Sequence, residues 1–335
     1  MKKVRILTID GGGIRGIIPA VILNYIEEQL QEKTNNPNAT LADYFDMIAG
    51  TSTGGILTTL YLLPADAGDT KNSRYFAKEA IELYKQYGRT IFTRRKSTRL
   101  LRPAYISDGL KKILKEKIGD VKLSEVRKPC MITAYDISNR NTVFFTLPAA
   151  KRFLRRDYYM RDIARATSAA PTYFQPAEIH SLAGNAYHLI DGGIFANDPA
   201  MSAVVEARKT TFPQCANPRF EDMYVVSIGT GKVVKRYEYE RVKRWGLLQW
   251  IRPVIDMMMS SSAEVVNYQV QKLFEAIGCS SCYVRIEPDL GMASSNMDNV
   301  SDRNISNLVN AGLTFVRNNT GMLNGIVDEL IKNDM

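Results

Sequence analysis

The sequence predicts an α/β fold, a three-layer α/β/α sandwich with a largely parallel central sheet. Two observations near the amino terminus lead to this prediction. An apolar run rich in β-branched residues, Val4–Ile9, is followed by a glycine loop and by apolar residues at helical spacing in Ile17–Gln31. The same strand–turn–helix order recurs in Phe45–Ala49 and Gly54–Leu63. Alternation of strands and helices is typical of a parallel sheet covered by helices.

The rest of the chain continues this alternation. Apolar spacing predicts helices at 74–87, 107–117, 160–169, 246–276, 301–317 and 320–332. It predicts strands at 130–136, 142–147, 187–190, 224–228 and 283–287. Asp198-Pro199 predicts a further helix start, because Asp is a good N-cap and Pro suits the first helical position. Since no repeat or linker interrupts the chain, we expect one domain over 1–335. Its core spans about 4–205, and C-terminal strands and helices at about 220–333 pack on that core.

The composition indicates an ordinary globular protein, with 335 residues of which 45% are hydrophobic and 24% charged. No apolar run is long enough to span a membrane. The apolar stretch after Met1-Lys2-Lys3 is too short for a signal peptide. We therefore expect a cytoplasmic protein with no signal peptide or transmembrane segment. The net charge of +9 suits an acidic partner, such as an anionic lipid or a nucleotide.

The cysteines and histidines do not form a metal-binding pattern. Cys279 and Cys282 form one C-x-x-C, but a structural zinc site needs a second pair or nearby histidines. The two histidines, His180 and His188, are far away in the sequence. We therefore expect no metal site, no cofactor and reduced thiols.

The segment Gly50-Thr51-Ser52-Thr53-Gly54 is a G-x-S-x-G pattern between a predicted strand and a predicted helix. Small residues on both sides of the serine leave room for a sharp turn that projects its hydroxyl. The amino terminus of the following helix favours the negative charge that develops there during acyl transfer. We predict that Ser52 is a nucleophile and that Gly50 and Gly54 permit its turn.

A serine hydroxyl needs a base to react at neutral pH. In α/β-hydrolases the base is a histidine that follows the acid in the chain, but no histidine follows Asp191 here. His180 and His188 could serve only with an earlier acid such as Asp136, and they flank a segment that we interpret as an exposed loop. The histidine pattern therefore disfavours a Ser-His-Asp triad.

The remaining candidate base is Asp191. It ends a short apolar strand and is followed by Gly192 and Gly193. This position is at the carboxyl edge of the sheet, where α/β active sites assemble, and the glycines allow a neighbouring loop to approach. The alternative is an ordinary turn aspartate. We predict a Ser52–Asp191 dyad.

A glycine loop, Asp10-Gly11-Gly12-Gly13-Ile14-Arg15-Gly16, enters the first predicted helix. Its backbone N–H groups can hold a phosphate or the oxyanion of an acyl-transfer intermediate. A P-loop pattern is missing, and a dinucleotide site would require an acidic residue after a second strand, where only Glu32 stands. We therefore predict that Gly11, Gly12 and Gly13 form an oxyanion hole. Arg15 either adds a positive charge near this oxygen or a lipid phosphate, or is a surface arginine.

The three motifs stand in the order found in the patatin family of lipid acyl hydrolases, which this sequence resembles. The similarity extends through Ala164–Pro176, Leu41–Asp46, Ser227–Gly231 and Trp245–Trp250, and it is closest to patatin proper. The resemblance implies a calcium-independent Ser-Asp dyad that hydrolyses acyl esters of phospholipids through an acyl-enzyme. It maps the nucleophile to Ser52, the proton acceptor to Asp191 and the oxyanion hole to Gly11, Gly12 and Gly13. It also implies a lipid substrate and no nucleic acid partner.

Other segments concern the membrane. Arg89–Arg102 and Lys151–Arg156 mix basic with apolar residues, so we expect a peripheral, transient membrane contact to which both belong; the alternative is a solvated basic loop. Both tryptophans lie in Trp245–Trp250, which we interpret as part of a core helix rather than an interfacial anchor. We likewise interpret Met257-Met258-Met259 as packing.

Three alternative functions remain open from the sequence. Some bacterial patatin-like proteins are membrane-degrading effectors of anti-phage defence that a cyclic nucleotide activates, and the basic composition leaves room for such a ligand. An acyltransferase would share the nucleophile and the acyl-enzyme. A storage or binding protein would keep the fold with a vestigial site.

Overall fold

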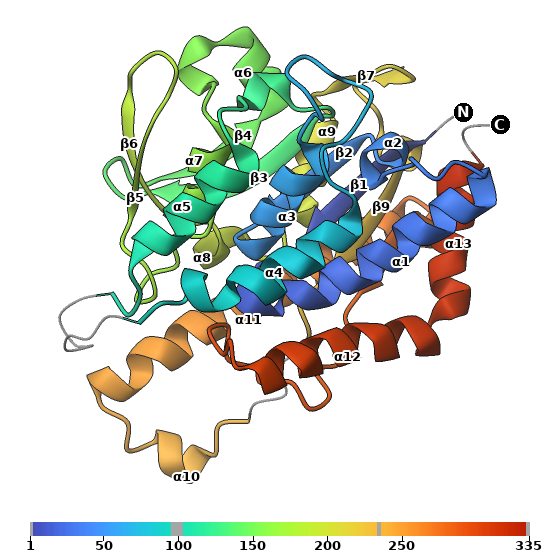
Figure 1. Ribbon diagram of the computed structural model, residues 1–335. Coiled ribbons are helices and arrows are strands. Elements are labelled where there is room, and N and C mark those ends of the chain that lie inside the picture. The colour runs from blue at the N-terminus through green and yellow to red at the C-terminus, as the bar shows by residue number, and fades with distance from the viewer. Residues whose placement is uncertain (1–2, 95–102, 233–235, 333–335) are drawn as a thin grey trace.

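A computed structural model describes residues 3–94, 103–232 and 236–332 of the chain. Its centre is an eight-stranded sheet in the order β10-β9-β1-β2-β3-β6-β5, with β4 paired to β3 outside this path (Figure 1). Strands β10, β9, β1, β2 and β3 are parallel, whereas β4, β5 and β6 pair antiparallel with their neighbours. The strands are β1 Val4–Ile9, β2 Met47–Thr51, β3 Cys130–Asp136, β4 Asn141–Thr146, β5 Ala177–His180, β6 Ala186–Asp191, β9 Met223–Ile228 and β10 Tyr283–Ile286. A separate two-stranded sheet joins β7 Thr211–Phe212 to β8 Cys215–Ala216.

Helices connect and cover these strands. The α-helices are α1 Ile17–Thr34, α2 Leu41–Tyr44, α3 Thr53–Leu62, α4 Ala77–Ile91, α5 Ser107–Ile118, α6 Leu147–Arg152, α7 Met160–Thr167, α8 Gly193–Ala196, α9 Ala200–Ala207, α10 Tyr239–Val242, α11 Leu247–Ala276, α12 Asp302–Asn318 and α13 Thr320–Ile331. Short 3₁₀ helices are η1 Gly13–Gly16, η2 Leu123–Glu125, η3 Leu154–Arg156, η4 Phe220–Asp222 and η5 Ser280–Cys282. Each helix that the apolar spacing predicts is present, with bounds that differ by a few residues.

The sheet is buried on both faces because its side chains alternate between two hydrophobic clusters. In β1, Leu7 and Ile9 pack with α1, α3, α12 and α13, whereas Val4 and Ile6 pack on the other face with α9 and α11. Strand β9 alternates in the same way. This is the three-layer α/β/α arrangement that the sequence predicts (Figure 1).

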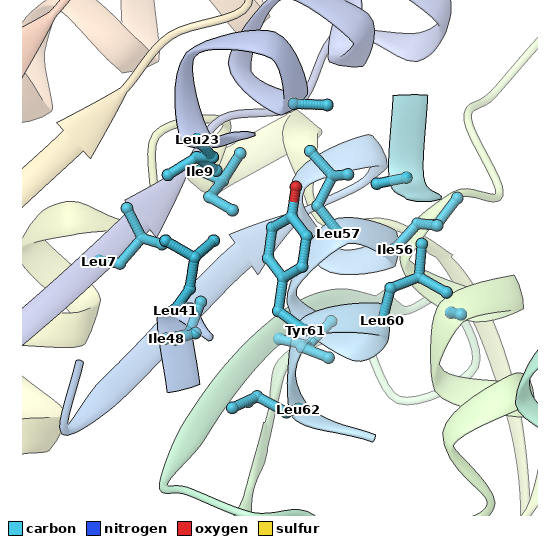
Figure 2. Packing of buried hydrophobic residues seen from close by; sticks show 14 of the residues in the cluster. Leu7, Ile9, Leu23, Leu41, Ile48, Ile56, Leu57, Leu60, Tyr61 and Leu62 are labelled. Carbon is cyan, nitrogen blue, oxygen red and sulfur yellow. The ribbon is translucent and has the colours of Figure 1, made fainter. Parts of the chain in front are cut away.

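Helix α3 is the part of the core that positions the candidate nucleophile. Every one of its residues is buried. Figure 2 shows the ring of Tyr61 among Leu41, Leu57 and Leu60. Fully burying one such side chain contributes about 1.5–3 kcal/mol to the free energy of unfolding. This packing therefore holds α3 in place, and with it Ser52, which directly precedes the helix.

Two of the expectations from the sequence are wrong, and one is confirmed. Cys279 and Cys282 form a disulfide rather than a pair of reduced thiols, because the η5 turn brings their side chains together. The Trp245–Trp250 segment is not a core helix, since Leu247 is 81% exposed and α10 and the start of α11 project from the body (Figure 1). His180 ends β5 and His188 lies in β6, so both exposed histidines flank the 181–185 loop, as the sequence predicts.

The described residues lack both a membrane-spanning helix and a cluster of metal-binding side chains. Over 3–94, 103–232 and 236–332, none of the helices is long and apolar enough to cross a membrane. Within the same ranges, no group of three or more His, Cys, Asp or Glu side chains is arranged to hold a metal ion.

Candidate active site

Ser52 lies in a strained turn between β2 and α3. Its φ of 55° and ψ of −119° place it in a region that residues with a side chain rarely adopt. The turn is tight, because a Cβ at Gly50 would overlap the carbonyl of Gly54 and a Cβ at Gly54 would overlap the carbonyl of Ile9. The Ser52 N–H donates to Thr167 Oγ1 at 2.8 Å. This is the geometry that a G-x-S-x-G nucleophile turn requires.

Asp191 ends β6, which the antiparallel pairing of Ala134 with Asp191 places at the carboxyl end of β3. Its Oδ1 accepts a hydrogen bond from the Gly193 N–H at 2.8 Å. Its Oδ2 is buried and has no hydrogen-bond partner among the described residues. Asp191 and Ser52 line the same cavity. The cavity that Ser52 lines therefore also holds a carboxylate, one of whose buried oxygens accepts no hydrogen bond.

Burial raises the pKa of Asp191 to about 7, while Ser52 and the Gly193 N–H lower it in part. Because the Ser52 hydroxyl is one of the groups that lower this pKa, it lies close to the Asp191 carboxylate. A carboxyl group with a pKa near neutrality can both accept and return a proton at physiological pH.

The glycines after Asp191 allow this close packing. A Cβ at Gly192 would overlap the Thr133 side chain, and a Cβ at Gly193 would lie 2.9 Å from Met259 Cε. The backbone at both positions must therefore lie close to its neighbours. The two glycines therefore let the backbone after Asp191 lie close to its neighbours, as the sequence predicts.

The glycine loop lies beside Ser52. A Cβ at Gly11 would come within 3.2 Å of the Ser52 Cβ, and one at Gly12 would overlap the Thr230 side chain. The Gly11 N–H donates to the Asn197 carbonyl at 3.0 Å. Within the described part of the chain, the N–H groups of Gly12 and Gly13 have no acceptor. Two of the three predicted oxyanion-hole amides are thus free, whereas that of Gly11 is engaged.

The carbonyl groups of the glycine loop accept hydrogen bonds from Thr230 and Arg15. The Gly11 carbonyl accepts from Thr230 Oγ1 at 2.9 Å, and the Gly12 carbonyl accepts from Arg15 Nε at 3.3 Å. Arg15 is buried rather than a surface residue. Its Nη1 donates to the Gly231 carbonyl at 3.5 Å, and no carboxylate of the described residues forms an ion pair with it. Burial lowers the pKa of this guanidinium.

A buried ionic network, which the sequence pattern does not predict, holds the start of the glycine loop. Arg285, in β10, donates from Nη1 and Nη2 to the two carboxylate oxygens of Asp10 at 2.9 and 2.6 Å. The same guanidinium bonds Asp198 Oδ2 at 3.1 Å and Ser227 Oγ at 2.8 Å. A bidentate pair fixes orientation as well as position. No sequence signal pointed to Arg285, because it is a single arginine in an otherwise ordinary strand.

An apolar cavity of about 50 Å³ opens at Ser52. Helices α3, α4, α5 and the segment after α7 contribute its lining, which includes Gly13, Ser52, Thr53, Ile56, Tyr84, Ile91, Phe92, Leu110, Ser168, Ala170, Tyr173, Phe174, Asp191, Met259 and Met297. A second small cavity shares Ile56, Tyr84, Ile91 and Leu110, and continues between the same helices to Ile118. Met259, interpreted from the sequence as a packing residue, is buried and also lines the cavity at Ser52.

A polar cavity of about 540 Å³ lies on the other side of Tyr173, Met259 and Met297, which line both spaces. Its charged lining residues are Asp10, Arg15, Lys232, Asp256, Glu264, Arg285 and Glu287. Arg15 belongs to this space and not to the cavity of Ser52. The candidate site therefore has an apolar side and a polar side.

The two basic segments of the sequence do not share a face. Arg89 is exposed near the end of α4, close to Phe92, which lines the Ser52 cavity; residues 95–102 of this segment lie outside the described residues. Lys151–Arg156 follows β4, whose end pairs with the amino end of β3. Because Ser52 stands at the carboxyl ends of the strands, Lys151–Arg156 lies at the opposite end of the molecule (Figure 1).

Known proteins share this sequence pattern. The model of the patatin-like phospholipase family matches residues 7–204. The chain is 34% identical over 331 residues to a Solanum tuberosum protein named "Probable inactive patatin-3-Kuras 1", an alignment that covers 94% of this chain and 87% of that protein. It is 34% identical over 332 residues to Patatin-2-Kuras 4 of the same plant, with coverage of 94% and 87%. A solved structure, VipD from Legionella pneumophila, aligns with 95% of this chain and 67% of its own at a TM-score of 0.36 and 11% identity, which is too low to support an argument.

Proposed function

Because the chain belongs to the patatin-like phospholipase family, we propose that it hydrolyses acyl esters of phospholipids and related lipids through a Ser52–Asp191 dyad. The family supports lipid acyl hydrolase activity in general. The observation that supports the finer proposal is the unpartnered, buried Oδ2 of Asp191 in the cavity that Ser52 lines. The scarcity of histidines agrees with it, since His180 and His188 are exposed on the β5–β6 hairpin.

The first half of the reaction forms an acyl-enzyme. Asp191 takes the proton of the Ser52 hydroxyl while the serine oxygen attacks the ester carbonyl carbon. The carbonyl oxygen becomes negative, and the free N–H groups of Gly12 and Gly13 stabilise it. Asp191 then gives its proton to the leaving alcohol oxygen as the ester C–O bond breaks. A lysolipid or a deacylated alcohol leaves, and the acyl group remains on Ser52.

The second half repeats these steps with water. Asp191 accepts a proton from water, whose oxygen attacks the acyl-enzyme, and the same amides stabilise the second oxyanion. The proton returns to the Ser52 oxygen, and a fatty acid is released. The protein's own groups supply the base and the oxyanion donors, so we propose that the reaction does not depend on calcium.

The two cavities suggest how the lipid binds. The apolar cavity beside Ser52 suits the acyl chain, and the polar cavity suits the head group. Arg15 is a buried cation without a carboxylate partner among the described residues, and it lines the polar cavity. We propose that it binds the phosphate of a phospholipid in addition to holding the Gly12 carbonyl.

The name of one relative shows why this function needs a direct test, because it describes an inactive patatin. The decisive variant is Ser52→Ala, assayed for fatty acid release from phospholipid in mixed micelles with a chelator and without nucleotides. We expect activity to fall by about 10⁴-fold or more. A serine-reactive phosphonate should label the wild type and not this variant.

A matched control is Ser168→Ala. Ser168 lines the same cavity, and its hydroxyl donates to the Ala164 carbonyl at 2.7 Å rather than to the reacting groups. We expect this variant to keep most of its activity. If Ser52→Ala released fatty acid as fast as the wild type, the dyad would be excluded. Activity that appeared only after a cyclic nucleotide was added would favour the effector function instead.

A further inference from the structure

The segment 236–251, which we call the arm, projects from the body of the molecule and contains α10 and the start of α11 (Figure 1). No residue of α10 is buried. Fifteen large apolar side chains are exposed in the described part of the chain, and eight of them lie between Tyr239 and Tyr268. In the arm itself, Leu247 and Leu248 are 81% and 68% exposed. A cluster of exposed apolar side chains on a projecting element indicates an interaction surface.

The arm has its own internal packing. The ring of Trp245 contacts Tyr237 and Trp250 edge to face, with centroids 5.4 and 5.2 Å apart. The N–H of Gly246 donates to Gln249 Oε1 at 2.6 Å at the start of α11. These contacts join the residues on either side of α10 to the first turns of α11, and they leave the two leucines exposed. The arm therefore has aromatic contacts of its own, while Leu247 and Leu248 stay exposed.

The charges of the arm complement an anionic surface. Its four basic residues, Arg236, Arg241, Lys243 and Arg244, are exposed, and its two acidic residues are Glu238 and Glu240. Glu240 pairs with Lys243, which leaves three arginines without a carboxylate partner among the described residues. Basic side chains beside exposed leucine, tyrosine and tryptophan are typical of segments that bind the interface of anionic membranes.

The position of the arm connects it to the candidate active site. Tyr237 of the arm lines the polar cavity, and further along α11 Met259 lines both cavities. Met292 is 83% exposed, and it lies in the loop that also contains the cavity residue Met297. The arm is therefore connected directly to residues that line both cavities.

We propose that the arm docks this protein on an anionic lipid bilayer, with Leu247, Leu248 and Ile251 among the acyl chains and the arginines at the head groups. This inference rests on the proposed lipid acyl hydrolase function, because docking has a catalytic purpose only if lipid is the substrate. An anionic bilayer has an apolar interior that can bury the exposed leucines and a negative surface that can bind the arginines.

The tryptophans provide a direct test, since Trp245 and Trp250 are the only two in the chain. Ser52→Ala protein, which should not consume the lipid, is mixed with vesicles of equal parts phosphatidylcholine and phosphatidylglycerol. We expect the tryptophan emission to shift to the blue and to be quenched when the lipids carry brominated acyl chains. Vesicles of phosphatidylcholine alone should give a smaller change. Unchanged emission with the anionic vesicles would overturn the proposal.

A pair of matched variants tests the location of the contact. Leu247→Glu with Leu248→Glu alters the arm, and Phe153→Glu with Leu154→Glu alters an exposed apolar pair that also stands beside arginines, at the opposite end of the molecule. We expect the first pair to weaken flotation with anionic vesicles by about ten-fold and the second to leave it unchanged. Equal losses in both, or no loss in the first, would contradict docking through the arm.

Two further measurements separate the outcomes. Hydrolysis of a water-soluble short-chain ester needs no membrane, so the arm variant should keep it. If the wild type and Ser52→Ala were equally inactive on that ester, the proposed function would fail while the binding data would still stand. If the arm variant instead converted a dimer to a monomer in light scattering and kept vesicle binding, the partner would be a second copy of the chain and the proposal would be wrong.

Discussion

The apolar cavity beside Ser52 and the polar cavity beside Arg15 share a wall but differ in how the chain builds them. The apolar side comes mainly from residues before 200, in helices α3, α4, α5 and the segment after α7. The polar side adds Thr230, Asp256, Arg285 and Asn296, which lie far along the chain. The family match over residues 7–204 covers most of the first side and little of the second. The residues that we propose for acyl transfer all lie in the matched region, whereas most of the proposed head-group cavity, apart from Asp10, Arg15, Tyr173 and Asn197, is built by later residues.

Beyond Ser52→Ala, the largest effect should come from Asp191, the proposed proton acceptor, because the proposed mechanism needs it for every ester. We expect Asp191→Asn to lower hydrolysis of phospholipid and of neutral ester alike, by about 10³-fold or more, because asparagine cannot accept the serine proton. Steady-state rates on both substrates measure this. Asp136→Asn is the control, since Asp136 is equally buried at the carboxyl end of neighbouring β3 but bonds its own turn.

The pH dependence distinguishes a proton acceptor from a structural aspartate. Burial raises the pKa of Asp191 to about 7, so the ionised base is lost below that pH. We expect kcat/KM of the wild type to fall about ten-fold per pH unit below about 7. The raised pKa also means that the neutral carboxyl stabilises the fold at low pH and that this stability is lost as pH rises through about 7. The Tm of Asp191→Asn relative to wild type should therefore increase as the pH rises from about 4 to about 7 and level off above pH 7. A constant difference from pH 4 to pH 7 would argue against a buried, titrating carboxyl.

A smaller effect should be confined to the polar side. We expect Arg15→Met to lower phospholipid hydrolysis about ten-fold more than diacylglycerol hydrolysis, because only the phospholipid presents a phosphate. The ratio is the useful quantity, since Arg15 also holds the Gly12 carbonyl and its loss slows both reactions. Lys232→Met, which removes an exposed cation from the same cavity, should change the ratio little. Equal losses on both lipids in Arg15→Met would restrict this residue to a positioning role.

The smallest effect should be confined to the apolar side. Leu110 lines both the Ser52 cavity and its continuation, whereas Leu114 lines only the continuation. We expect Leu110→Phe to shift preference toward shorter acyl esters by about three-fold, because a larger ring narrows the path close to the serine. Leu114→Phe should affect only the longest chains. A series of esters of increasing chain length measures the shift, and an unchanged preference in both variants would place the acyl chain elsewhere.

Much of the fold was predictable because its signals are local. The runs Val4–Ile9 and Cys130–Asp136 became strands with the predicted bounds, and the Gly246–Ala276 pattern became one long helix. Burial of that helix was not predictable in the same way. Apolar residues in Trp245–Trp250 look like core residues in a sequence, yet no other element packs on Leu247 and Leu248 in the described structure. Whether an apolar side chain is covered depends on what the rest of the chain places beside it.

By itself, the sequence determined the strained turn at Ser52, the glycine loop and the carboxylate after a short strand, because each is a local backbone pattern with a chemical requirement. Only the tertiary structure decided that the Gly11 amide is engaged while those of Gly12 and Gly13 are free. It also decided that Arg285 clamps Asp10, a contact between residues 275 positions apart in the chain. Such contacts depend on strand order, and strand order is fixed by the packing of the whole sheet rather than by any short segment.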